Sequence, residues 1–141
     1  MPTWVKVVLV IVLVGFVLLI GGAIVAARWV RAKGERLQEQ GKVLVSEAEA
    51  FGRGNETEAC VAESLRRLRT CPGFICETKV NVFLTTCLSV AKPTPGLCTG
   101  VPGPMQPLEG AKWQAAECQR RGYPGERCMR TMAALQGYCS R

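Results

Sequence analysis

Hydrophobic residues form one uninterrupted run near the start of the chain and recur at helical spacing further on. Residues 7–27, VVLVIVLVGFVLLIGGAIVAA, contain no charged side chain. As a helix rising about 1.5 Å per residue, this run is roughly 31 Å long and matches the hydrocarbon core of a bilayer. The pattern predicts a transmembrane helix within residues 1–30.

Two other interpretations of this run stay open. A signal peptide cleaved near Ala27 would leave a secreted protein, because Val25, Ala26 and Ala27 resemble a small-residue cleavage site. A buried helix of a soluble protein would have the same hydropathy. The length of the run and the single Lys6 ahead of it favour the uncleaved helix, which we expect to sit in the lipid bilayer.

Basic and aromatic residues flank the run on both sides. Those expected at the membrane interfaces are Trp4, Lys6, Arg28, Trp29, Arg31 and Lys33. Most of the bases follow the run, so the positive-inside rule favours a cytoplasmic C-terminus. The eight cysteines, all within residues 60–139, favour an oxidising compartment instead. Because long translocated domains largely escape the charge rule, we expect the C-terminal domain outside the cytoplasm, in a periplasm, the extracellular space or an intermembrane space.

Residues 31–54 are mostly polar, with apolar positions such as Leu44, Ala48 and Phe51 on a sparse helical stripe. This pattern predicts a stalk helix that continues out of the membrane. Asn55 then resembles an N-cap, and Glu58 three residues later completes a capping box for the next helix. Asn55 also begins an Asn-Glu-Thr sequon, which matters only in a eukaryotic secretory setting.

Four cysteines within residues 55–91 are placed symmetrically. Ten residues separate Cys60 from Cys71 and ten separate Cys76 from Cys87, with Pro72-Gly73 in the short gap between the two pairs. Residues eleven apart lie on one face of a helix, so folding at the turn brings the two pairs together. The spacing predicts an antiparallel αα-hairpin with bridges Cys60–Cys87 and Cys71–Cys76. The β-branched residues of 79–90 would also suit a strand, but their apolar period favours a helix.

Two cysteine pairs on two antiparallel helices resemble the twin C-x9-C, or coiled-coil-helix, proteins. These are small disulfide-bonded proteins, mostly of the intermembrane space, that serve in assembly, scaffolding or metal handling. The resemblance covers only residues 60–87, the spacing here is ten instead of nine, and that family usually lacks an N-terminal transmembrane helix.

Residues 92–110 contain five prolines and four glycines and predict a linker. Residues 111–141 predict a second short helical hairpin with its turn at Tyr123-Pro124-Gly125. This hairpin resembles an imperfect copy of the first, and it suggests bridges Cys118–Cys128 and Cys98–Cys139. The core predicted for so small a domain is thin, and its large candidates are Leu65, Leu68, Phe74, Val80, Phe83, Leu84, Leu88, Trp113, Met132 and Leu135.

The composition argues against catalysis and metal binding. The chain has no His and no Asp, so it lacks an ordinary nucleophile–base pair, and its thiols are too widely spaced for a usual zinc site. We expect no catalytic residue, cofactor or metal. Residues 34–141 carry fourteen bases against eleven acids, an excess of three that is too small and scattered to predict nucleic-acid binding.

These patterns together predict an all-α, membrane-anchored, cysteine-rich module with an interaction or structural role. The side chains most suited to an anionic partner are Arg66, Arg67 and Arg69, although a solvated helix face has the same pattern. The first alternative is a membrane-tethered thiol–disulfide exchange protein that uses the local pair Cys71 and Cys76. The second is a cytoplasmic or metal-binding domain with free thiols.

Overall fold

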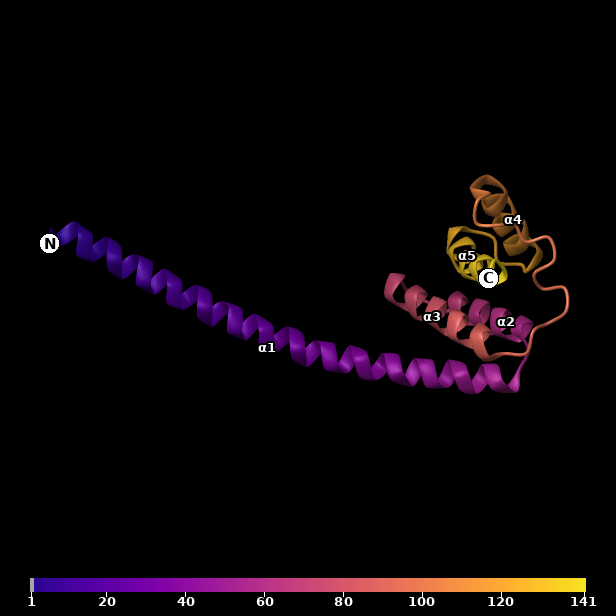
Figure 1. Cartoon of the computed structure of the whole chain (residues 1–141), viewed down its shortest axis with the longest axis horizontal. Coiled ribbons are helices and arrows are strands. Elements are labelled where there is room, and N and C mark those ends of the chain that lie inside the picture. Colours follow the sequence, from indigo (N-terminus) through magenta and orange to yellow (C-terminus); the bar gives the residue numbers. More distant parts are fainter. Residues whose placement is uncertain (1) are drawn as a thin grey trace. The chain divides into compact units, whose positions relative to one another are not determined.

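The structure, a computed structural model, describes residues 2–141, without the side chains of residues 32, 35 and 37. Its helices are α1 (Thr3–Gly54), α2 (Thr57–Arg69), α3 (Phe74–Val90), α4 (Pro107–Arg120) and α5 (Glu126–Cys139) (Figure 1). Over this range β-type pairing is limited to an isolated bridge between Glu56 and Lys92. The prediction of an all-α chain is confirmed, and the β-branched residues of α3 form a helix.

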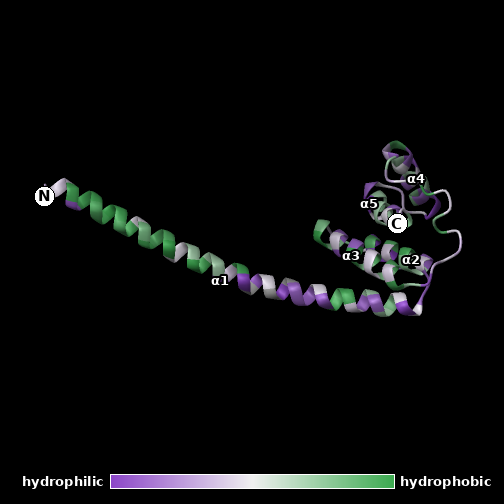
Figure 2. Cartoon of the chain, in the orientation of Figure 1, coloured by the Kyte–Doolittle hydropathy of each residue, from purple (hydrophilic) through white to green (hydrophobic). Residues whose placement is uncertain are grey.

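The chain divides into two compact units, the first ending at Gly41 and the second comprising Lys42–Arg141. In the first unit, Thr3–Arg31 is long and apolar enough to cross a membrane by length and composition (Figure 2). None of its most apolar stretch is buried within the protein. A membrane span and a signal sequence share these properties. Helix α1 continues through Gly34, because a glycine weakens a helix without preventing it.

The second unit consists of two helical hairpins that share one core. Helix α2 packs on α3, α4 packs on α5, and α5 also lies against both α2 and α3 (Figure 1). The large apolar side chains buried between them are Val61, Leu65, Leu68, Val80, Phe83, Leu84, Leu88, Met132 and Leu135. Most of the predicted core is therefore found at the interface between the helices.

Phe74 is a correction to the predicted core. Its side chain is 77% exposed, and that of the next residue, Ile75, is 72% exposed. Phe74 is the first residue of α3, directly after the Pro72-Gly73 turn, so it projects from the end of the hairpin instead of into it. Trp113 is only partly buried and packs against the edge of the core.

The last turns of α1 belong to the second unit and pack closely on its first hairpin. The rings of Phe51 and Phe83 have centroids 5.8 Å apart. A Cβ atom added to Gly52 would lie 2.6 Å from the carbonyl oxygen of Cys87 and 2.7 Å from a methyl carbon of Val90. Glycine therefore allows the backbone of α1 to approach α3 more closely than any other residue would.

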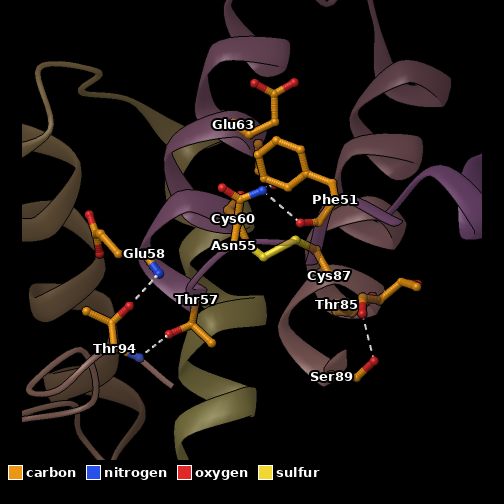
Figure 3. The surroundings of a disulfide bond; sticks show 12 residues. Phe51, Asn55, Thr57, Glu58, Cys60, Glu63, Thr85, Cys87, Ser89 and Thr94 are labelled. Atoms are coloured by element: carbon orange, nitrogen blue, oxygen red, sulfur yellow. Dashed lines mark hydrogen bonds between the residues drawn. A yellow bond between two sulfur atoms is a disulfide. The ribbon is translucent and has the colours of Figure 1, made fainter. Parts of the chain in front are cut away.

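The predicted capping box at Asn55 is wrong. The Asn55 side-chain amide donates a 2.8 Å hydrogen bond backward to the carbonyl oxygen of Phe51, at the end of α1 (Figure 3). The N-cap position of α2 is Glu56, which has no side-chain cap bond. The amide of Glu58 instead donates to the hydroxyl of Thr94, 36 residues away, and the amide of Thr94 donates to the hydroxyl of Thr57.

These reciprocal bonds attach the beginning of the linker to the first turn of α2.

The linker ends earlier than predicted, because α4 begins at Pro107, where the fixed φ of proline suits the first turn of a helix. The turn between α4 and α5 uses Gly122 and Gly125, whose φ angles of 69° and 131° lie in a region that other residues rarely adopt.

Candidate functional site

Four disulfides hold the helices of the second unit together. Cys60–Cys87 joins α2 to α3 with Cα atoms 5.8 Å apart, and Cys71–Cys76 spans the turn of this hairpin with Cα atoms 5.6 Å apart (Figure 3). Two helices that pack closely bring their backbones to this distance, which suits a bridge. Figure 3 labels Cys60 and Cys87 beside Phe51, so this bridge lies where α1 meets the hairpin.

The second hairpin carries the other two bridges. Cys118–Cys128 joins α4 to α5 with Cα atoms 5.9 Å apart, and Cys98–Cys139 ties the linker to the end of α5 with Cα atoms 5.3 Å apart. The four pairs are the same as those suggested by the sequence spacing. All eight cysteines are bridged in the structure. Within residues 2–141, no group of three or more metal-binding side chains is found.

A groove lined by four arginines lies between the outer face of α2 and the end of α4. Its volume is about 460 Å³, and we call it the arginine groove. The residues that line it are Glu58, Ala62, Leu65, Arg66, Arg69, Arg120 and Arg121. The α2 members recur at intervals of three and four residues, so they share one face of the helix. The other two arginines are adjacent in the sequence, because Arg120 ends α4 and Arg121 directly follows it.

Three of the four arginines, Arg66, Arg69 and Arg120, are exposed enough to contact a ligand. The side chains of Arg66 and Arg120 are 71% and 66% exposed, and each is paired with a glutamate three residues earlier in its own helix. Each guanidinium group binds its glutamate through Nε and Nη2, so its Nη1 group is not used in this pair and can bind a ligand carboxylate. Arg69 carries its guanidinium carbon 5.8 Å from the centre of the Tyr123 ring.

Arg121 forms the wall of the groove. It is largely buried, and it donates to both carboxylate oxygens of Glu58 at 2.7 and 3.0 Å and to Glu117 at 2.7 Å. Although burial opposes its charge, these hydrogen bonds raise the pKa of Arg121. Since Glu58 belongs to α2 and Arg121 follows α4, this pair fixes the two sides of the groove against each other.

Two carboxylates beside the groove, Glu63 and Glu117, have lowered pKa values. The hydrogen bond from Arg66, followed by that from Arg67, lowers the pKa of Glu63 to about 2. The hydrogen bond from Arg120, followed by that from Arg121, lowers the pKa of Glu117. With Glu58, these three acids face four arginines and leave an excess of one positive charge.

The structure separates Arg67 from the other two predicted partner residues. Its guanidinium donates to Glu63 and, at 2.6 Å, to Glu47 of α1. Its guanidinium carbon lies 3.9 Å from the centre of the Phe83 ring. Arg67 therefore joins α1 to the hairpin, and the groove receives Arg120 and Arg121 in its place.

The predicted interface residues all lie on α1. Trp4, Lys6, Arg28, Trp29, Arg31 and Lys33 are exposed within the protein. The ammonium group of Lys33 lies 4.1 Å from the centre of the Trp29 ring, so a base and an aromatic side chain stand together just after the apolar run.

A second ionic cluster joins α5 to the turn of the first hairpin. Glu77 accepts hydrogen bonds from Arg127 at 2.6 Å and from Arg130 at 2.8 Å, and the Arg130 bond is the main cause of its lowered pKa. Sequence reasoning missed this cluster and the α4 side of the groove. In both places the ion-paired residues lie more than 45 residues apart in the sequence. The only local sign of either cluster in the sequence was therefore the adjacent pair Arg120-Arg121.

Comparison of the chain with protein-family models, with curated proteins and with solved structures returned no match. The functional argument therefore rests on the geometry of this chain.

Proposed function

We propose that this chain is a single-pass membrane protein whose disulfide-bonded helical domain lies outside the cytoplasm and binds an acidic segment of a protein partner, without enzymatic activity. The observation that carries the proposal is the arginine groove, in which four guanidinium groups from two helices surround one surface depression.

An acidic peptide fits this groove by shape and charge. The planar guanidinium group binds a carboxylate through two parallel hydrogen bonds, and extended acidic segments offer several carboxylates in a row. Arg66 and Arg120 can each bind such a group through the part of the guanidinium that its intrahelical glutamate does not use, while Arg121 keeps the walls in place. Leu65 and Ala62 at the floor add apolar contact.

Two further features support the location. Thr3–Arg31 has the length and hydropathy of a membrane span, and four disulfides persist only where the compartment is oxidising. If the run is instead a signal peptide cleaved near Ala27, the same domain is secreted. Intact mass of the mature chain, measured together with alkaline extraction of membranes, separates these cases, since an anchored chain keeps residues 1–27 and stays with the lipid.

Binding is tested with the full chain in nanodiscs of neutral lipid and a deca-glutamate peptide, with deca-glutamine as the uncharged comparison. The double substitution Arg66→Gln and Arg120→Gln should weaken binding by roughly tenfold or more, because it removes two hydrogen-bonding charges. Arg53→Gln is the matched control, since Arg53 is 67% exposed, is paired with Glu49 within its own helix, and does not line the groove.

We expect the groove substitutions to weaken binding of the deca-glutamate peptide selectively. Added salt should lower the affinity for this peptide further. Equal affinity for the groove variant and the Arg53→Gln control, or equal binding of both peptides, would contradict the proposal.

A further inference from the structure

Two large apolar side chains are left in solvent at the end of the first hairpin. Phe74 and Ile75 are both more than 70% exposed and follow the exposed Pro72. Together with Cys76 and Lys79 these residues line one continuous and mostly apolar surface, which we call the tip. A domain with so thin a core gains nothing internally from exposing two of its largest apolar residues.

The tip is held rigidly. The Cys71–Cys76 bridge closes the turn from which Phe74 and Ile75 project. Arg127 of α5 donates a 2.6 Å hydrogen bond to the carbonyl oxygen of Cys71, and Glu77, in the first turn of α3, is bound by Arg127 and Arg130. A rigid apolar projection binds with little loss of conformational entropy.

The surroundings of the tip are basic. Lys79 lies on the tip surface, and Arg127 and Arg130 stand beside it. The neighbouring acids are Glu77 and Glu126, both ion-paired with Arg130. Three bases less two acids leave an excess of one positive charge, the sign that attracts anionic lipid headgroups.

The tip lies at the end of the second unit where the chain enters it. In this unit α1 begins at Lys42, and its Glu47 pairs with Arg67 near the end of α2, whereas Gly52 contacts the far end of α3. The turn that follows α2 is therefore at the same end as Lys42. Ten residues, 32–41, join Lys42 to the apolar segment, and even fully extended they reach about 35 Å.

We infer that the tip inserts Phe74 and Ile75 into the interfacial layer of the bilayer that contains the apolar segment, with the surrounding bases contacting anionic headgroups. This inference rests on the membrane anchor of the proposed function. It gives the domain a second attachment and a fixed orientation.

The test uses the full chain in vesicles of phosphatidylcholine with a minority of phosphatidylglycerol. The photoreactive residue benzoylphenylalanine replaces Phe74, and adducts are identified by mass after illumination. Leu108 is the matched control, because it is an apolar residue of α4 with the same exposure (76%) that does not belong to the tip. Phe16, within the apolar segment, is the positive control for the anchor. Disulfide mapping checks that each variant is folded.

The expected result is lipid adducts at position 74 in roughly tenfold excess over position 108, decreasing when phosphatidylglycerol is omitted. Lipid adducts at position 16 with no excess at 74 would overturn the inference and leave the anchor intact. Adducts between two copies at 74 would likewise overturn it, in favour of a dimer interface. No lipid adduct at position 16 would overturn both the anchor and the inference that rests on it.

Discussion

The guanidinium of Arg127 donates a 2.6 Å hydrogen bond to the carbonyl oxygen of Cys71, so α5 is bound directly to the disulfide-bonded turn between α2 and α3. The same side chain also donates to Glu77. No disulfide links the first hairpin to the second, as all eight cysteines pair within their own hairpin or its linker. The two halves are therefore joined by packing and by ionic contacts of this kind.

Removing the Arg127 side chain should weaken the contact between the halves. Arg127→Gln leaves the Cys71 carbonyl and one oxygen of Glu77 without their donor, so the thermal midpoint of the domain should fall by roughly 5 °C. Calorimetry on the full chain measures it, with Arg53→Gln as the control because that exposed arginine contacts only its own helix. Equal midpoints for the two variants would show that the Arg127 contacts contribute nothing.

Stability should decline in acid through Glu63. Its pKa in the folded protein is about 2, below the ordinary value of 4.5, so its ion pairs stabilise the fold fully above about pH 4.5. This contribution is lost progressively as the pH falls from about 4.5 to about 2. The lowered pKa values of Glu77 and Glu117 act in the same direction. Across this pH range the thermal midpoint of the Glu63→Gln variant should fall less steeply than that of the unsubstituted chain. An identical dependence of the midpoint on pH would show that Glu63 does not contribute to stability in this way.

Gly52 should tolerate no side chain. Gly52→Ala places a Cβ atom against the carbonyl oxygen of Cys87, which is backbone and cannot move aside, so the free energy of unfolding should drop by about 1–3 kcal/mol. Gly54→Ala is the control, because a Cβ there meets no atom within 4 Å. Denaturant unfolding of the two variants should differ in midpoint. A stabilised Gly52→Ala variant would show that α1 does not pack on α3 as described.

The disulfides should differ in their resistance to reduction. Cys60, Cys87, Cys118 and Cys128 are fully buried, whereas Cys76 and Cys139 are partly exposed and Cys98 is exposed. Under native conditions Cys71–Cys76 and Cys98–Cys139 should therefore open first, and the two buried bridges only on unfolding. Graded reduction followed by alkylation and peptide mapping measures this order. If Cys71–Cys76 opened far more readily than Cys98–Cys139, the thiol–disulfide exchange alternative would be favoured over a structural role.

Sequence spacing was informative wherever the physics is local. Residues eleven apart share a helix face, so the cysteine spacing led to the same first hairpin that the structure contains. Asn55 and Phe74 show where local rules fail. Asn55 has the chemistry of a cap, but Thr94 arrives from the linker and takes that role. Phe74 has the hydropathy of a core residue, but its position as the first residue of α3 directs it away from the core.

The arginine groove could be predicted only in part. The cluster of bases on α2 is visible in the sequence, and so is the pair Arg120-Arg121. Their meeting depends on how the two hairpins pack, with Glu58 and Arg121 separated by 63 residues. Arg67 lies outside the groove because its side chain binds Glu47, which belongs to another helix.

The arrangement of the bridges also bears on how the chain is made. In each hairpin one bridge encloses the other, as Cys60–Cys87 encloses Cys71–Cys76, and Cys98–Cys139 encloses Cys118–Cys128. The last cysteine of the first set precedes the first cysteine of the second. If the domain is translocated from its first residues onwards, it presents four cysteines with three possible pairings before any other thiol appears, instead of eight with 105. The order of the cysteines along the chain by itself protects oxidative folding from most mispairing.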